Sequence, residues 1–112
     1  MKFIIIFLMF ISFSTKAADK EGVYTIAGMG TSSCASYVED YKNQYLLLRY
    51  MAWANGYLTH LNTVTPGIKD ITERVDITAR KSWLLKYCKK NTLDNFNTAV
   101  KALVKELKKR HW

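Results

Sequence analysis

Apolar side chains recur at steps of three and four residues through most of the chain after position 33, and this spacing limits the fold to helices. A half-buried strand would instead alternate at every second residue. The spacing predicts helix from Cys34 to about Asn62 and allows a break near Asn43 into a short helix and a longer one. The apolar face of this stretch comprises Cys34, Tyr37, Val38, Tyr41, Tyr45, Leu48, Met51 and Ala52.

Residues 45–58 are nearly apolar all round. A helix without a polar face is typical of a central helix that neighbours cover on several sides. Gly56 lies three positions after Trp53, on the same helix face. Because glycine leaves a gap there, we expect another helix to cross the chain near Gly56.

Two further helices are predicted after the only proline of the chain. Pro66 and Gly67 mark a turn, because proline cannot continue a helix. Residues 77–90 then form a helix that Asp70 or Asp76 can cap and that ends at Asn91. The side chains expected to point inward from it are Ile77, Trp83 or Leu84, Tyr87 and Cys88.

The last helix has the clearest apolar stripe of the chain. Thr92 is expected to cap it, and the stripe comprises Leu93, Phe96, Val100, Leu103, Val104 and Leu107. Four helices with short connections predict an all-α fold, a small four-helix bundle-like domain.

The first 17 residues have the features of an export signal. Lys2 precedes a short apolar run, and Thr15 and Ala17 are small residues at the spacing that signal peptidase requires. The run is about half the roughly 20 residues that span a bilayer, which disfavours the alternative of an uncleaved anchor helix. We therefore expect a signal peptide over 1–17, cleaved near Ala17, and a periplasmic protein without a stable membrane anchor. Residues 18–33 then form a flexible segment, and residues 34–112 form the helical domain.

Export also decides how the two cysteines are interpreted. Cys34 and Cys88 are the only cysteines, and an exported chain meets an oxidising compartment. A reactive thiol or a metal pair is the alternative, but neither cysteine has a nearby cysteine or histidine ligand. The sequence predicts one disulfide between Cys34 and Cys88.

Positive charge is concentrated at the C-terminal end. The chain has 17 Lys and Arg against 9 Asp and Glu, and residues 80–112 alone hold 10 basic and 2 acidic residues. Export and the lack of interleaved aromatics in the last helix argue against nucleic acid. A solvated face, a membrane surface contacted by residues 93–112, and an acidic protein partner stay open. The candidate partner-binding residues are Lys101, Lys105, Lys108 and Lys109.

The sequence has no recognisable catalytic, metal-binding or cofactor-binding pattern. His60 is a single histidine on the predicted central helix, and Glu39 and Asp40 point about 100° apart as helix neighbours. No phosphate-binding loop or dinucleotide motif occurs. We therefore expect a protein that is not an enzyme and that holds no cofactor or metal.

Three short motifs carry a resemblance to known exported proteins: residues 54–58 (ANGYL), residues 87–91 (YCKKN), and residues 99–103 (AVKAL) with Leu93 before them. With a signal peptide and Cys34 near the domain start, they resemble small periplasmic acid-stress chaperones of the HdeA/HdeB type. They are also similar to disulfide-stapled helical immunity proteins of type VI secretion effectors.

The resemblance implies an exported helical protein that binds other proteins. The chaperone type is the first expectation, and an immunity protein or inhibitor of a secreted effector enzyme is the alternative. A homodimer is also possible. Cys34, Cys88 and Asn91 match the family pattern, whereas Thr92 stands where a proline often follows. The few carboxylates of this basic chain argue against an identical acid trigger.

Overall fold

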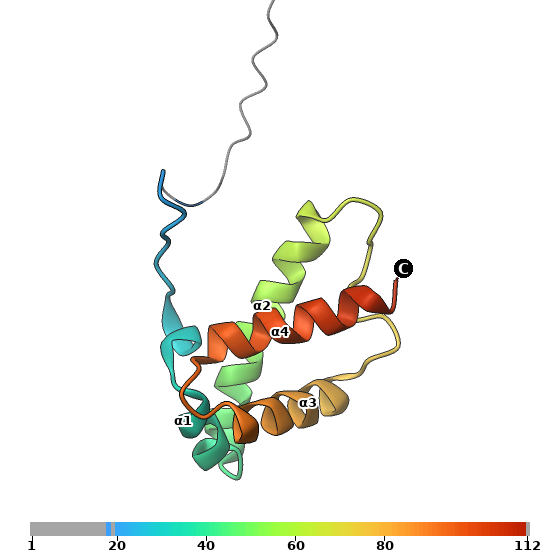
Figure 1. Ribbon diagram of the computed structural model, residues 1–112. Helices are drawn as coiled ribbons and strands as arrows, with labels where there is room; N and C mark the ends of the chain where they lie inside the picture. The colour runs from blue at the N-terminus through green and yellow to red at the C-terminus, as the bar shows by residue number, and fades with distance from the viewer. Residues whose placement is uncertain (1–17, 19, 112) are drawn as a thin grey trace, which may run out of the picture.

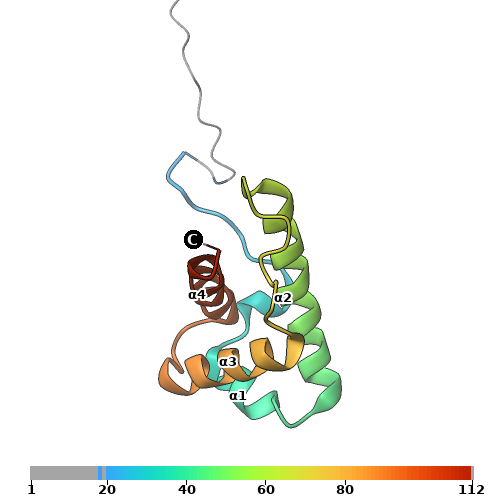
Figure 2. The ribbon, with the colours of Figure 1, turned by 90° about the vertical axis from the view of Figure 1, so that its right-hand side faces the viewer.

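The chain folds into four α-helices and one short 3₁₀-helix, as the computed structural model shows for residues 18 and 20–111 (Figure 1). Helix α2 stands upright in both ribbon views, and α3 and α4 run in directions transverse to it, with α4 to one side of α2 and seen nearly end-on in the second view (Figure 2). The described residues contain no strand. The predicted all-α fold is confirmed. The helices are η1 (Gly28–Thr31), α1 (Cys34–Asp40), α2 (Gln44–Val64), α3 (Ile77–Lys90) and α4 (Phe96–Lys109).

Each α-helix begins at a polar residue whose side chain accepts a hydrogen bond from a free backbone N–H of the first turn. Ser33 caps α1, Asn43 caps α2 and Asp76 caps α3, with acceptor distances of 3.0, 3.1 and 2.8 Å. These caps satisfy N–H groups that have no partner inside the helix. The predicted break near Asn43 is therefore confirmed, and Asp76 rather than Asp70 is the cap.

The predicted start of α4 is wrong. Asn95, not Thr92, caps the helix by accepting from the Thr98 N–H at 2.8 Å, and the Leu93 side chain is 100% exposed. The preceding loop is instead paired with the residues before α1. The Cys34 N–H donates to the Asp94 carbonyl and the Phe96 N–H donates to the Ser32 carbonyl, both at 2.7 Å. Because the Asp94 carbonyl and the Phe96 N–H are engaged by residues before α1, they are not available for the hydrogen bonds of a helical turn over residues 92–96.

The core lies where α1, α2 and α4 meet around an aromatic cluster. The Tyr37 and Phe96 ring centroids are 5.0 Å apart, and Tyr50 packs edge-on against both rings. Cys34 and Cys88 form the predicted disulfide, fully buried, and it joins α1 to α3. From Phe96 onward the predicted stripe of α4 is buried as expected. On α3, Leu84 rather than Trp83 is buried.

Helix α2 is not covered on several sides, contrary to the prediction. Its buried residues are Tyr50, Met51, Ala54 and Leu58, whereas Tyr45 and Leu48 are 70% and 65% exposed. Gly56 is exposed and a Cβ placed there would have no neighbour within 4 Å, so no helix crosses at this point. Only one face of α2 packs on the core, although both faces carry apolar residues.

The segment before α1, expected as flexible, packs against α2 in its second half. The Ala27 carbonyl accepts a hydrogen bond from the Trp53 indole at 2.6 Å, and Gly30 of η1 is buried. A Cβ at Gly30 would collide with the Trp53 ring. The predicted signal peptide, residues 1–17, lies outside the described residues.

Candidate binding surface

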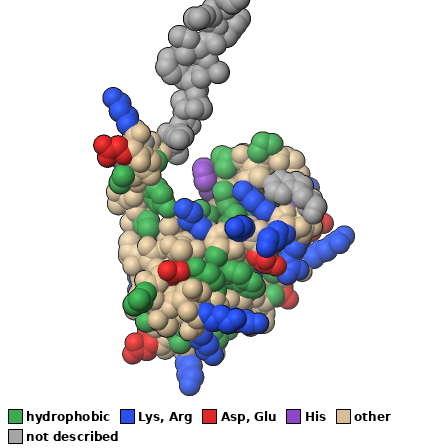
Figure 3. Space-filling model, viewed as in Figure 1, with side chains coloured by type: hydrophobic (Ala, Val, Ile, Leu, Met, Phe, Trp, Pro, Cys, Tyr) green, Lys and Arg blue, Asp and Glu red, His purple; other side chains and the backbone are tan. Residues whose placement is uncertain are grey.

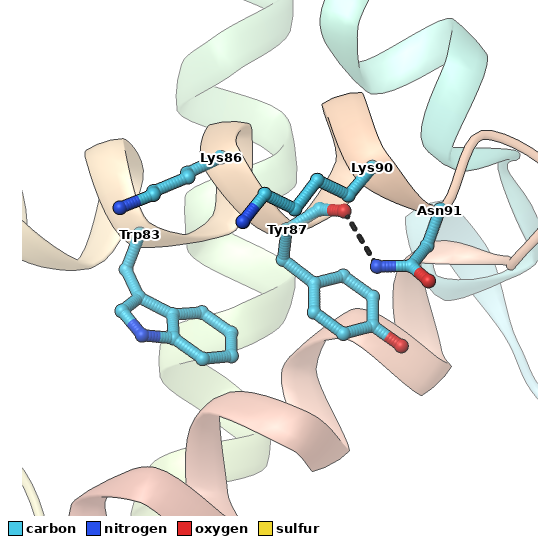
Figure 4. Close-up of a pocket in the computed structure, with 5 residues that line it drawn as sticks. All are labelled: Trp83, Lys86, Tyr87, Lys90 and Asn91. Carbon is cyan, nitrogen blue, oxygen red and sulfur yellow. Dashed lines mark hydrogen bonds between the residues drawn. The ribbon is translucent and has the colours of Figure 1, made fainter.

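Helix α3 carries a groove that combines two stacked aromatic rings with two lysines. The Trp83 and Tyr87 rings are nearly parallel, with centroids 5.7 Å apart and an interplanar angle of 13°. Lys86, Lys90 and Asn91 complete the lining of a cavity of about 250 Å³. Both rings extend from the same side of α3, as the close-up shows (Figure 4). Positions 83, 86, 87 and 90 share one helix face, which brings the lysines beside the rings.

The Tyr87 side chain is held firmly in the groove. Its hydroxyl donates to an Asp94 carboxylate oxygen at 2.6 Å, and its ring stacks on Trp83. The Asn91 amide donates to the Tyr87 backbone carbonyl at 2.9 Å, which holds the Asn91 side chain. The hydrogen bond to Asp94 raises the pKa of the Tyr87 hydroxyl, and burial adds to the increase. The ring is therefore fixed before any ligand arrives, which lowers the entropy cost of binding.

The surroundings of the groove are positively charged. Lys86, Lys89 and Lys90 are exposed on α3, and Lys105 is exposed on α4. The space-filling view shows a hydrophobic area flanked by Lys and Arg side chains on the face where α3 and α4 lie (Figure 3). Such a surface attracts acidic partners and repels basic ones.

Two of the four predicted partner-binding lysines already have partners in the chain. Lys101 donates to the Tyr24 hydroxyl at 3.2 Å and lies 5.5 Å from the centre of that ring. Hydrogen bonds from Asn97 and Lys101 lower the pKa of Tyr24, and the bond to Tyr24 raises the pKa of Lys101. Lys109 lies 3.8 Å from the Glu106 carboxylate.

Lys105 is exposed and Lys108 is half-buried on the same helix. The four lysines therefore do not form one equivalent, open set. Arg80, the first basic residue of the charged C-terminal part, also points to its own chain. Its guanidinium donates to the Val75 carbonyl at 2.6 Å and to the Asn55 amide oxygen at 3.3 Å, so it ties the loop before α3 to α2.

The groove was not predicted from the sequence, because Tyr87 and either Trp83 or Leu84 were assigned to the core. The spacing Trp83, Lys86, Tyr87, Lys90 was the available signal, since it places two rings and two lysines on one helix face. Both rings are only partly buried, at the edge of the core. Burial at an edge depends on neighbouring helices, which the spacing within one helix does not reveal.

None of the protein families, curated proteins or solved structures compared with this chain matches it. Among the described residues, no helix is long and apolar enough to cross a membrane. The same part of the chain has no cluster of three or more His, Cys, Asp or Glu side chains that could hold a metal ion. His60 is exposed on α2.

Proposed function

We propose that this chain is an exported, periplasmic protein that binds an acidic surface of another protein and catalyses no reaction. The groove formed by Trp83 and Tyr87, with Lys86 and Lys90 beside the rings, carries this proposal. Aromatic rings with cationic neighbours are typical of the residues that contribute most to protein interfaces. The buried disulfide suits an oxidising compartment.

Two roles are compatible with such binding. A stress chaperone of the HdeA/HdeB type would bind many unfolded clients, whereas an immunity protein or inhibitor would bind one folded effector. The fixed Tyr87 ring favours the second role, since a preformed groove selects a partner of matching shape.

Charge reversal on α3 tests the proposal. Partners are first captured from a periplasmic extract by cross-linking and identified. Each partner is then purified, and the rate of its association with the wild-type protein is measured. The double variant Lys86→Glu and Lys90→Glu should slow association about tenfold or more at low salt. Both lysines are exposed, so folding should change little.

The matched control reverses Lys42 and Lys69, which are exposed outside α3 and α4. We expect this control to associate at close to the wild-type rate. A wild-type rate that is independent of salt, or equal slowing by both double variants, would contradict the proposed surface. The exposed Tyr45 and Leu48 face of α2 would then be the next surface to test.

A further inference from the structure

The described residues contain two stacked Trp–Tyr pairs of the same construction. Trp53 and Tyr57 lie four positions apart on α2, and Trp83 and Tyr87 lie four positions apart on α3. The ring centroids are 5.7 Å apart in both pairs, with interplanar angles of 27° and 13°. The two pairs differ in what covers them.

The pair on α2 is covered by the chain's own N-terminal segment. Ala27 is extended, with φ −108° and ψ 145°, and its carbonyl accepts the Trp53 indole N–H at 2.6 Å. Gly28 and Gly30 bring the backbone onto the ring, where a Cβ at Gly30 could not fit. Upstream, the Tyr24 hydroxyl accepts a hydrogen bond from the Lys101 ammonium. A segment that presents a backbone carbonyl to the indole and continues with closely packed glycines, here in the 3₁₀-helix η1, thus fits a Trp–Tyr pair of this kind.

The pair on α3 has no such cover among the described residues. The indole N–H of Trp83 has no acceptor among the described residues and is not buried, so it is open to an acceptor from a ligand. The adjoining cavity of about 250 Å³ is smaller than the roughly 300–1,000 Å³ of ligand pockets. It therefore does not enclose a cofactor, and it suits contact with one part of a larger partner.

We propose that the Trp83–Tyr87 groove binds an acidic, glycine-containing peptide segment of the partner. A backbone carbonyl of the segment accepts the Trp83 indole N–H, a glycine lies against the stacked rings, and carboxylates of the segment meet Lys86 and Lys90. This inference rests on the proposed function and deepens it, because it places the contact on α3 and defines the peptide chemistry.

The test uses the intact, disulfide-bonded protein and a short synthetic peptide of alternating glutamate and glycine. The indole N–H signals are followed by NMR at up to millimolar peptide, after assignment by single Trp→Phe substitutions. We expect the Trp83 signal to move in a saturable manner and the Trp53 signal to stay in place. A peptide of alternating lysine and glycine should move neither signal.

Two variants examine the contacts separately. Trp83→Phe keeps a ring but loses the indole N–H, and should weaken peptide binding about 2- to 10-fold, the range of one net hydrogen bond. Lys86→Gln with Lys90→Gln should weaken binding more strongly than Trp83→Phe. The matched control, Lys42→Gln with Lys69→Gln outside α3 and α4, should bind the peptide about as well as the wild type.

Three results would overturn the inference. One is an unmoved Trp83 signal at millimolar peptide. Another is tighter binding of oligothymidylate, an anionic single strand whose bases can stack on aromatic rings, than of the acidic peptide. The third is peptide binding that is weakened no more by the α3 pair of substitutions than by the control pair. In that third case the peptide chemistry assigned to the groove is wrong, and the proposed function stands only if charge reversal of Lys86 and Lys90 still slows association with the partner. If charge reversal also leaves partner association unchanged, the proposed function fails as well.

Discussion

At the scale of single residues, two glycines have opposite surroundings and should respond in opposite ways to the same substitution. Gly30 packs against the Trp53 ring, whereas Gly56 faces open space on α2. Gly30→Ala should lower the free energy of unfolding by about 1–3 kcal/mol, because the added methyl group overpacks the contact. Gly56→Ala should raise it by about 0.5–1 kcal/mol, because alanine is the better helix former.

Urea denaturation followed by circular dichroism measures both effects, and each variant serves as the control for the other. Destabilisation by Gly56→Ala would mean that a further helix or a second molecule packs at this position. A neutral Gly30→Ala would mean that the N-terminal segment does not lie on Trp53.

Several single residues could be predicted from the sequence because their roles are local. Asp76 was one of two candidate caps for α3, and Asn91 was the predicted end of that helix. A cap bonds to an N–H three residues later, so the sequence contains both partners. The surroundings of Gly56 depend on distant residues, and that prediction was wrong.

At the scale of elements, the start of α4 can be tested with two matched polar residues. Asn95 accepts a hydrogen bond from the Thr98 N–H, whereas the Thr92 residue contributes its backbone carbonyl to Ala35. Asn95→Ala should therefore cost about 1 kcal/mol of unfolding free energy. Thr92→Ala should change it by less than about 0.5 kcal/mol, since the backbone bond is kept.

Denaturation curves of the two variants decide between the caps. A larger loss for Thr92→Ala than for Asn95→Ala would move the start of the helix back to the position predicted from the sequence.

The buried face of a helix could be predicted only where the opposite face is polar. Helix α4 has lysines opposite its apolar stripe, and the stripe is buried from Phe96 to Leu107. Helix α2 has apolar residues on both faces, so Tyr45 and Leu48 were assigned to the core although they are exposed. Periodicity gives the direction of burial only when one face is polar.

At the scale of the whole molecule, the charge asymmetry can be predicted from the sequence, but which of the basic side chains remain open to a partner cannot. The sequence showed that basic residues gather after position 79. The folded chain pairs Lys101 with Tyr24, Lys109 with Glu106 and Arg80 with Val75, which leaves lysines of α3 open beside the Trp83–Tyr87 groove. Which charges are free depends on contacts between elements, and sequence spacing does not contain those contacts.

The disulfide connects this surface to the stability of the whole fold. Cys88 directly follows Tyr87 on α3, and its bond to Cys34 on α1 closes a separation of 54 residues. Replacing both cysteines with alanine should lower the unfolding free energy by about 4 kcal/mol, because the denatured chain gains conformational freedom. The melting temperature should fall by about 15 °C or more for a domain of this size.

Thermal unfolding of the double alanine variant, with the chemically reduced wild type as control, measures this loss. The two proteins should melt at similar temperatures, and the Trp83 indole signal should broaden in both, because α3 is then held by packing alone. A loss below about 1 kcal/mol would mean that the denatured chain is already constrained without the bond. Since the groove residue Tyr87 is the neighbour of Cys88, peptide binding should weaken together with stability. An unchanged peptide affinity would show that the groove keeps its shape without the disulfide.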